Sequence, residues 1–253
     1  SKYLMFLDSD DYWNSDKALN NISIKLEKNK DVDIIMYKEI SYYMKSNKFY
    51  HNKYYYDNNF IVNKDKKDVI EYLIKTNNFS ATAWSVVVKR ELIVKNNIYF
   101  TKGIKSEDID WSINLFIKAK TFDSINDRFL IYRKERPDSI TNSVGEQNIR
   151  DLLFIISKWS KLLCDNKDYE VNKIFLGYLA YQYSILIYLL SKVNICSKNE
   201  ILEEVKKYKY LLRYGLNNKS IYTKYFVNML GINNSIKILG IIIDLKEKIR
   251  KKG

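Results

Sequence analysis

The sequence has 253 residues, of which 46% are hydrophobic, and a formal net charge of +13. A chain of this length holds one large domain or two small ones, and its single histidine, His51, excludes a histidine-based metal cluster within it. The positive charge favours an anionic partner, either a nucleic acid, a nucleotide-linked substrate or an acidic membrane surface.

The N-terminal third reads as alternating strands and helices. KYLMFL is a short continuous apolar run that stops at a polar turn, which predicts a strand buried on both faces. SDKALNNISIKLEKN follows with Leu19, Ile22 and Leu26 at helical spacing, and Ser15 is the expected N-cap. VDIIMY predicts a second strand, and EISYYMK with KFYHNKYYY predicts a hairpin or two exposed strands.

The same alternation continues to about residue 135. DKKDVIEYLIKT predicts a helix, and ATAWSVVVKREL predicts a strand that runs into a short helix. EDIDWSINLFIKA has apolar residues on one helical face, with Ser106 as the expected cap, and RFLIYRKE predicts a further strand. These elements predict an α/β class with a mixed sheet and flanking helices.

From about residue 147 long helical periods dominate, and no strand is predicted. We therefore expect two domains, 1–146 and 147–253. The longest apolar run, at 174–190, contains tyrosines together with Gln182 and Ser184, which favours a buried helix over a membrane span. Cys164 and Cys196 lie in apolar helical surroundings and are expected to be buried free thiols.

An acidic cluster follows the first strand. Asp8 and Asp10 are two residues apart in a segment expected to be extended, so both carboxylates would face one site and Asp11 would face away. Two carboxylates suit Mg²⁺ or Mn²⁺, although a helix-capping acidic turn has the same composition. An EF-hand is excluded, because Trp13 and Leu19 occupy its Gly and Glu positions.

The segment KSEDIDW adds a second acidic group. Glu107 and Asp108 fall in the first turn of a predicted helix, where carboxylates are ordinarily favoured by the helix dipole. Asp108 shares a helical face with Trp111, and a carboxylate beside an aromatic ring can be partly desolvated and act as a general base.

A basic segment, YRKERPDSIT, follows the last predicted strand. Its cations Arg133, Lys134 and Arg136 precede the only proline, Pro137. These groups either neutralise a leaving phosphate or form a solvated basic turn.

Together the three segments resemble family 2 glycosyltransferases, the inverting bacterial enzymes with the GT-A fold. The resemblance rests on YLMFLDSDDYW, on ATAWSVVVKRELIVKNNIYFTKGIKSEDIDWSINLFIKA and on LIYRKERPDSITNS, and it covers residues 1 to about 143. It implies a partial GT-A, Rossmann-like mixed sheet followed by an all-helical C-terminal region. Because the family's first strands precede the D-x-D strand, it also implies that the N-terminal part of the nucleotide-binding subdomain is missing and that this fragment alone is inactive.

The resemblance implies roles for individual residues. Asp108 would be the general base, and Asp10 would hold Mn²⁺ or Mg²⁺ on the donor diphosphate. The donor-binding residues would be Asp8, Asp10, Asp11 and Arg136, and the substrate-positioning residues would be Glu107, Trp84 and Trp111. Asp8 would lie on the ribose side.

The implied function is transfer of a sugar from a nucleotide-sugar donor to a glycan or lipid-linked acceptor, in cell-surface polysaccharide or glycolipid synthesis. We expect a cytoplasmic protein, at the inner face of the membrane, that binds no nucleic acid. Its basic C-terminal helix, SIKILGIIIDLKEKIRKKG, either lies on an anionic membrane or packs on the core as an ordinary terminal helix with a basic end. Two alternatives stay open at this point. They are phosphoryl transfer of the haloacid dehalogenase type at Asp8, and a non-enzymatic basic module for membrane or nucleic acid.

Overall fold

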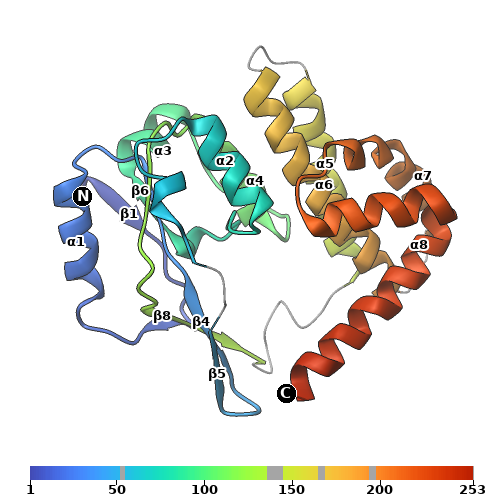
Figure 1. Ribbon diagram of the computed structural model, residues 1–253, viewed down its shortest axis with the longest axis horizontal. Coiled ribbons are helices and arrows are strands. Elements are labelled where there is room, and N and C mark those ends of the chain that lie inside the picture. Colours follow the sequence, from blue (N-terminus) through green and yellow to red (C-terminus); the bar gives the residue numbers. More distant parts are fainter. Residues whose placement is uncertain (52–54, 136–144, 165–168, 194–197, 253) are drawn as a thin grey trace. The chain divides into compact units, whose positions relative to one another are not determined.

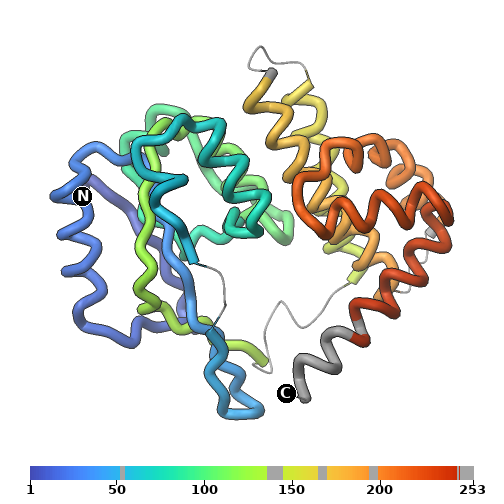
Figure 2. Tube along the Cα trace, viewed as in Figure 1, coloured from blue at the N-terminus to red at the C-terminus, as the bar shows by residue number. Residues whose placement is uncertain are grey.

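The computed structural model describes residues 1–51, 55–135, 145–164, 169–193 and 198–252 (Figures 1 and 2). It forms two compact units, the first of Ser1–Leu73, Asn78–Lys102 and Glu107–Ser143, and the second of Ile74–Asn77, Gly103–Ser106 and Val144–Gly253. The predicted class, α/β with a helical C-terminal region, is confirmed. The proposed domain limits, 1–146 and 147–253, stay a prediction.

In the first sheet the carboxyl ends of several strands lie on the same side, which we call the carboxyl edge of the sheet. Its order is β1 (Tyr3–Met5), β6 (Val86–Lys89), β3 (Ile34–Met36) and β7 (Phe122–Ser124). β1 and β3 both run antiparallel to β6, and β7 runs parallel to β3. The carboxyl ends of β1, β3 and β7 therefore lie at the edge where β6 begins, and the acidic segment follows β1 at this edge.

The second sheet connects the acidic segment to the basic one. Its order is β2 (Tyr12–Trp13), β8 (Leu130–Lys134), β4 (Glu39–Tyr43) and β5 (Lys48–His51). β2 follows directly after Asp11 and pairs with β8, with Tyr12 opposite Ile131. The predicted hairpin is confirmed by the antiparallel pairing of β4 with β5.

The helices α1 (Ala18–Lys28), α2 (Lys66–Lys75), α3 (Arg90–Asn96) and α4 (Glu107–Lys118) agree with the sequence patterns. The N-cap of α1 is Lys17, so the expectation for Ser15 is wrong. Ser15 instead begins the preceding turn, because its Oγ accepts the N–H of Lys17 at 3.2 Å and its carbonyl accepts the N–H of Ala18 at 3.3 Å. Ala18 and Ile22 then bury one face of α1 in the core.

Two strands differ from expectation. β1 is half-buried and not covered on both faces, since it is the edge strand of its sheet and pairs with β6. β7 was not predicted, because its sequence FDS contains two polar residues. All three of its residues are nevertheless buried, with Asp123 paired to Lys25 at 2.9 Å.

The second unit is helical, and from residue 145 onward the described residues contain no strand. Its elements are α5 (Glu146–Cys164), α6 (Tyr169–Lys192), α7 (Lys198–Lys207), the 3₁₀ helix η4 (Lys209–Tyr214) and α8 (Asn218–Lys252). α6 is the predicted buried helix, with 72% of its apolar window inside the structure. Cys164 is free but exposed, at the end of α5, and Cys196 lies outside the described residues.

Candidate active site

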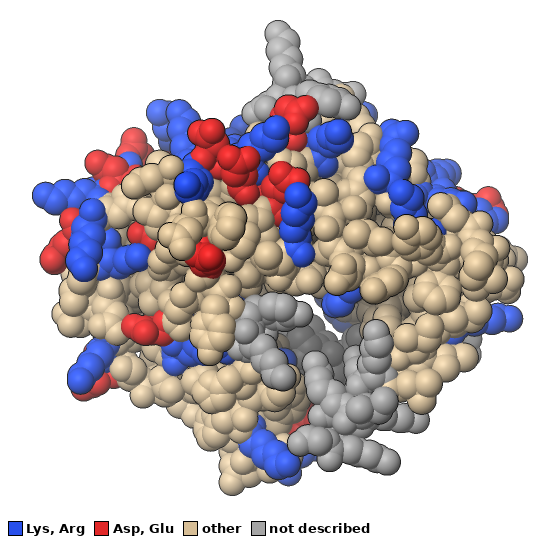
Figure 3. All heavy atoms as spheres, viewed as in Figure 1, with Lys and Arg blue, Asp and Glu red and all other residues tan. Residues whose placement is uncertain are grey.

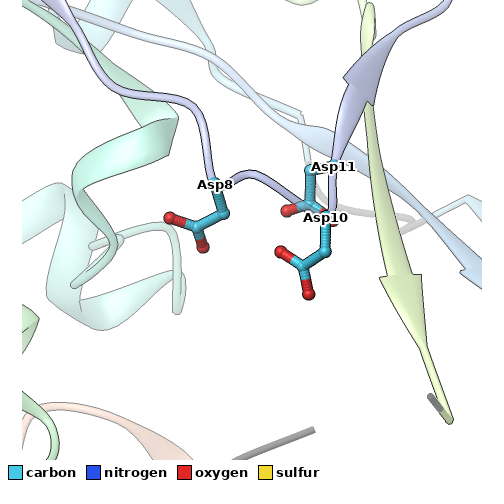
Figure 4. A group of neighbouring side chains, drawn as sticks. All are labelled: Asp8, Asp10 and Asp11. Carbon is cyan, nitrogen blue, oxygen red and sulfur yellow. The ribbon is translucent and has the colours of Figure 1, made fainter. Parts of the chain in front are cut away.

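Asp8, Asp10 and Asp11 lie in a tight turn and not in an extended segment. The N–H of Asp11 donates to the carbonyl of Asp8 at 3.0 Å, which closes a four-residue turn. One carboxylate oxygen from each aspartate lies within 4.8 Å of the other two (Figure 4). The expectation that Asp11 faces away is therefore wrong, because side chains alternate only along an extended backbone.

Arg133 anchors this turn to β8. Its backbone N–H donates to Asp11 Oδ1 at 2.9 Å, and its Nε donates to the carbonyl of Asp10. Asp11 is 7% exposed, and its second oxygen, Oδ2, is buried without a hydrogen-bond partner in the described part of the chain. Burial raises the pKa of Asp11 to about 6, with smaller contributions from Asp10 and Asp8, although the Arg133 N–H opposes the shift.

The three carboxylates fit a divalent metal. They offer hard oxygen donors, which Mg²⁺ and Mn²⁺ prefer, and exposure increases from buried Asp11 through Asp10 to exposed Asp8. The uncompensated Oδ2 of Asp11 is a group that a cation would satisfy. The exposed side of the cluster leaves room for water and for phosphate oxygens.

A second group of carboxylates, Glu107 and Asp108 at the start of α4, interacts electrostatically with Asp8. Burial raises the pKa of Asp108 to about 6, and the negative charges of Glu107 and Asp8 add to this effect. The backbone N–H of Ala83 donates to Asp108 and opposes it. The pKa of Asp8 is also raised, by burial first and then by Asp10 and Glu107. The end of β1 and the start of α4 therefore share one electrostatic site.

The loop that carries Ala83 is held by a ring of hydroxyl groups. Ser80 and Thr82 lie 2.9 Å apart at their side-chain oxygens, Thr82 Oγ1 donates to Ser85 Oγ at 2.9 Å, and Ser80 and Ser85 are separated by 2.7 Å. These bonds fix the backbone on both sides of Ala83, so its N–H is held toward Asp108.

The two tryptophans that were expected to position the substrate pack inside the structure. Trp84 is 8% exposed and stacks on Tyr132, with ring centroids 5.4 Å apart. Trp111 is 1% exposed, stacks on Phe100 at 5.1 Å and meets Phe6 edge-on at 5.5 Å. Trp111 therefore supports the segment that leads into Asp8, and contact of either ring with a substrate stays a prediction.

The basic segment is described only in part. Arg136, expected near the diphosphate, lies outside the described residues. Arg133 was part of the basic run but was not singled out as a site residue. Its contacts with Asp10 and Asp11 depend on the pairing of β2 with β8, which the local sequence does not indicate.

No family model and no curated protein matches the sequence. The structure is similar to that of S. aureus TarS residues 1-349, with a TM-score of 0.51 and 12% identity, covering 100% of this chain and 67% of that one. A longer S. aureus TarS structure gives a TM-score of 0.48 and 13% identity, covering 93% of this chain and 40% of that one. The chain thus spans well under two thirds of the longer protein. TarS is a glycosyltransferase, and the likeness shows a glycosyltransferase-type fold.

Proposed function

We propose that this chain is a metal-dependent, inverting glycosyltransferase of family 2 that moves a sugar from a nucleotide-diphosphate donor to a hydroxyl acceptor. The observation that carries the proposal is that two clusters of acidic residues share one electrostatic site. One cluster lies in the turn after β1, and the other lies in the first turn of α4. Either group alone is an ordinary acidic turn or helix start. Their meeting at one sheet edge, in a fold like that of TarS, supports a transferase site.

Asp108 is the proposed general base. A carboxylate with a pKa of about 6 accepts a proton more readily than one at the ordinary 3.8, and at neutral pH it is still ionised. Asp108 would take the proton of the acceptor hydroxyl as that oxygen attacks the sugar carbon. Glu107, on the same helix turn, would orient the acceptor or the donor sugar.

The aspartate turn would bind the donor. Asp10 and Asp11 would hold Mn²⁺ or Mg²⁺, and Asp8 would lie on the ribose side. When bound, the ion supplies positive charge where the nucleoside diphosphate leaves. Arg133 keeps the turn closed, and Arg136 would add a cation near the diphosphate.

The wider role follows the same proposal. We place the reaction in cell-surface polysaccharide or glycolipid synthesis, with a glycan or lipid-linked acceptor, at the cytoplasmic side of the membrane. The net charge of +13 supports an anionic donor. The acidic site offers no surface for nucleic acid, and we propose none as a partner.

The test is nucleotide release by the full-length protein from UDP-, GDP- and CDP-sugars, with Mn²⁺ or Mg²⁺ and a hydroxyl acceptor mixture. We expect metal-dependent release that falls by about 100-fold or more in both Asp10→Ala and Asp108→Asn. The matched control is Asp31→Asn, because the Asp31 side chain is 77% exposed and pairs with Lys2 at the opposite edge of the sheet. It should keep wild-type activity.

The alternatives give different results. Phosphoryl transfer predicts a covalent phosphate on Asp8 and little effect of Asp108→Asn. The negative charge of Asp8 raises the pKa of Asp108, which supports a joint role of the two residues instead. A purely binding module predicts ligand affinity that depends on salt but not on Asp10 or Asp108. Absence of release together with absence of metal-dependent nucleoside diphosphate binding would contradict the transferase proposal.

A further inference from the structure

Two equally apolar helices of the second unit differ sharply in how the fold uses them. The helical stretches Glu170–Lys192 in α6 and Asn218–Ile243 in α8 each contain an 18-residue window with a mean hydropathy of 1.5, and both are long enough to cross a membrane by length and composition. In α6, 72% of the window is buried inside the structure, whereas in α8 only 28% is. Most residues of the apolar window of α8 are therefore not covered by the described residues.

The piece of α8 before Gly231 exposes three large apolar or aromatic side chains. Tyr222, Tyr225 and Met229 lie three and seven residues apart, on one helical face, and are 59%, 67% and 74% exposed. We call these three residues the aromatic face. The opposite side carries Ser220, Thr223 and Val227, which are at most 4% exposed. After the break α8 buries apolar residues instead, Ile232, Ile236 and Leu239, so the contrast belongs to the first piece alone. An exposed cluster of large apolar side chains marks a surface that fits an apolar environment.

α8 is not one straight helix. Gly231 has φ of 73° and ψ of 169°, so the helix is broken there, and Figure 1 shows its two pieces running in different directions. The piece before the break has 13 residues, or about 20 Å at 1.5 Å per residue, against about 30 Å of hydrocarbon core. A broken helix of this kind suits the interface of a bilayer, where water satisfies the free backbone groups.

The charge of α8 indicates which surface it meets. Between Asn218 and Ile243 the charged residues are Lys219, Lys224 and Lys237, and the window contains no acid. The basic tail KEKIRKK follows at 246–252. In Figure 3 the surface over the helical unit is largely uncharged, with Lys and Arg at its borders. Two copies of this helix packed face to face would bring like charges together, whereas an anionic lipid surface would neutralise them.

We propose that the aromatic face of α8 docks on an anionic phospholipid bilayer, with Tyr222, Tyr225 and Met229 in the interface and the lysines on the headgroups. Tyrosine suits this position because its ring is apolar and its hydroxyl stays hydrated. The proposal does not depend on the enzymatic one, since it rests on the second unit alone.

The test is co-sedimentation of the full-length protein with vesicles of phosphatidylcholine containing about one third phosphatidylglycerol. We expect wild type to bind these vesicles and not phosphatidylcholine alone. The variant Tyr222→Ser/Tyr225→Ser/Met229→Ser should bind about tenfold less tightly, and Lys237→Gln about fivefold less. The matched control is Phe154→Ser/Leu162→Ser on α5, where the side chains are 48% and 50% exposed, and it should bind like wild type.

All substituted side chains are exposed, so circular dichroism should report an unchanged fold. Wild type that stays in the supernatant would overturn the proposal, as would equal loss of binding in the control. Resistance of the bound protein to alkaline carbonate would show a spanning helix and also overturn it. The same holds for a dimer seen by light scattering that depends on the aromatic face, with no vesicle binding, because it would assign that face to a second copy.

Discussion

Asp11 and Asp108 both have a pKa raised to about 6, but their surroundings differ. Both shifts come first from burial. Asp11 Oδ1 accepts the N–H of Arg133, whereas Oδ2 is buried without a hydrogen-bond partner among the described residues, and we propose that a cation binds there. Asp108 is instead surrounded by the negative charges of Glu107 and Asp8, which favour the protonated form and so strengthen it as a base.

The proposed base predicts a pH profile. The acid limb of kcat/KM should lie near pH 6, where Asp108 loses its proton. Glu107→Gln removes a neighbouring negative charge that raises the pKa of Asp108, so the limb should move to lower pH whatever happens to the maximal rate. The measurement is nucleotide release between about pH 5 and about pH 8 at saturating metal.

Glu91→Gln is the control for this profile, because the Glu91 side chain is 69% exposed at the other edge of the sheet. Its limb should coincide with that of wild type. A limb that stays in place in Glu107→Gln, or moves to higher pH, would remove Asp108 from the role of base.

Lys38 predicts a second pH effect, on stability. It is 6% exposed, its Nζ lies 4.4 Å from the Tyr56 ring centroid, and burial lowers its pKa from 10.5 to about 8. Between about pH 8 and pH 10.5 the unfolded chain holds this proton and the folded chain does not, so the free energy of unfolding should rise with pH. Below that window both states are protonated, and the full cost of burying the charge remains.

The variant Lys38→Met lacks this titration. Its urea-unfolding free energy should rise less steeply with pH than that of wild type across the same window. Lys45→Met replaces an exposed lysine in the β4–β5 turn and should retain the wild-type slope. Parallel curves for wild type and Lys38→Met would show that the pKa of Lys38 is not lowered in the folded protein.

At the scale of elements, Gly177 marks a close approach inside the helical unit. A Cβ at this position of α6 would lie 2.7 Å from Leu216 Cδ1 and 2.9 Å from the Tyr214 carbonyl oxygen. The leucine tip can move but the carbonyl cannot, so Gly177→Ala should overpack the contact. We expect a net loss of about 1 kcal/mol in the free energy of unfolding, since overpacking by about 1–3 kcal/mol outweighs the gain in helix propensity.

Gly145→Ala is the matched change, because no atom of the described residues lies within 4 Å of a Cβ there. Because Gly145 is the N-cap of α5, where glycine is mildly favoured over alanine, urea unfolding should show Gly145→Ala within about 0.5 kcal/mol of wild type. If Gly177→Ala is equally stable, the close approach of α6 to the segment after η4 is wrong.

Elements with strong periodicity could be predicted from the sequence, and the short polar ones could not. The apolar spacing of EDIDWSINLFIKA is sufficient for α4, and the apolar run VDIIMY is sufficient for β3. β7 is stabilised by its pairing with β3 and by the Asp123 contact with Lys25, neither of which is local. The prediction of Ser15 as the N-cap of α1 was wrong because a serine before a helix can equally begin the turn that leads into it.

The candidate site divides in the same way. The acidic residues Asp8, Asp10, Glu107 and Asp108 stand out in the sequence, because each group sits at the end of a recognisable element. The turn that adds Asp11 to them depends on the hydrogen bond to Asp8 and on Arg133, which is 122 residues away. The hydroxyl ring around Ala83 has no sequence pattern that distinguishes it from an ordinary loop.

At the scale of the whole molecule, a strongly basic chain carries an acidic site. The net charge of +13 would attract the nucleoside diphosphate of the proposed donor over distances of about 10 Å at moderate salt, but the aspartate turn and the start of α4 would repel its phosphates locally. A divalent ion reverses that local field. Binding of the nucleotide should therefore require metal, and the weak binding that remains without metal should be the part most sensitive to salt.

Calorimetric titration of the full-length protein with the nucleoside diphosphate of its donor tests this argument. Adding EDTA should weaken wild-type binding by about tenfold or more, and raising NaCl should weaken the metal-free binding more than the metal-loaded binding. Asp10→Ala should abolish the gain from Mn²⁺ yet bind slightly more tightly than wild type in EDTA, because one repelling carboxylate is gone. This crossing of two affinities separates a metal-holding aspartate from one that merely supports the fold, since a structural defect would weaken binding under both conditions.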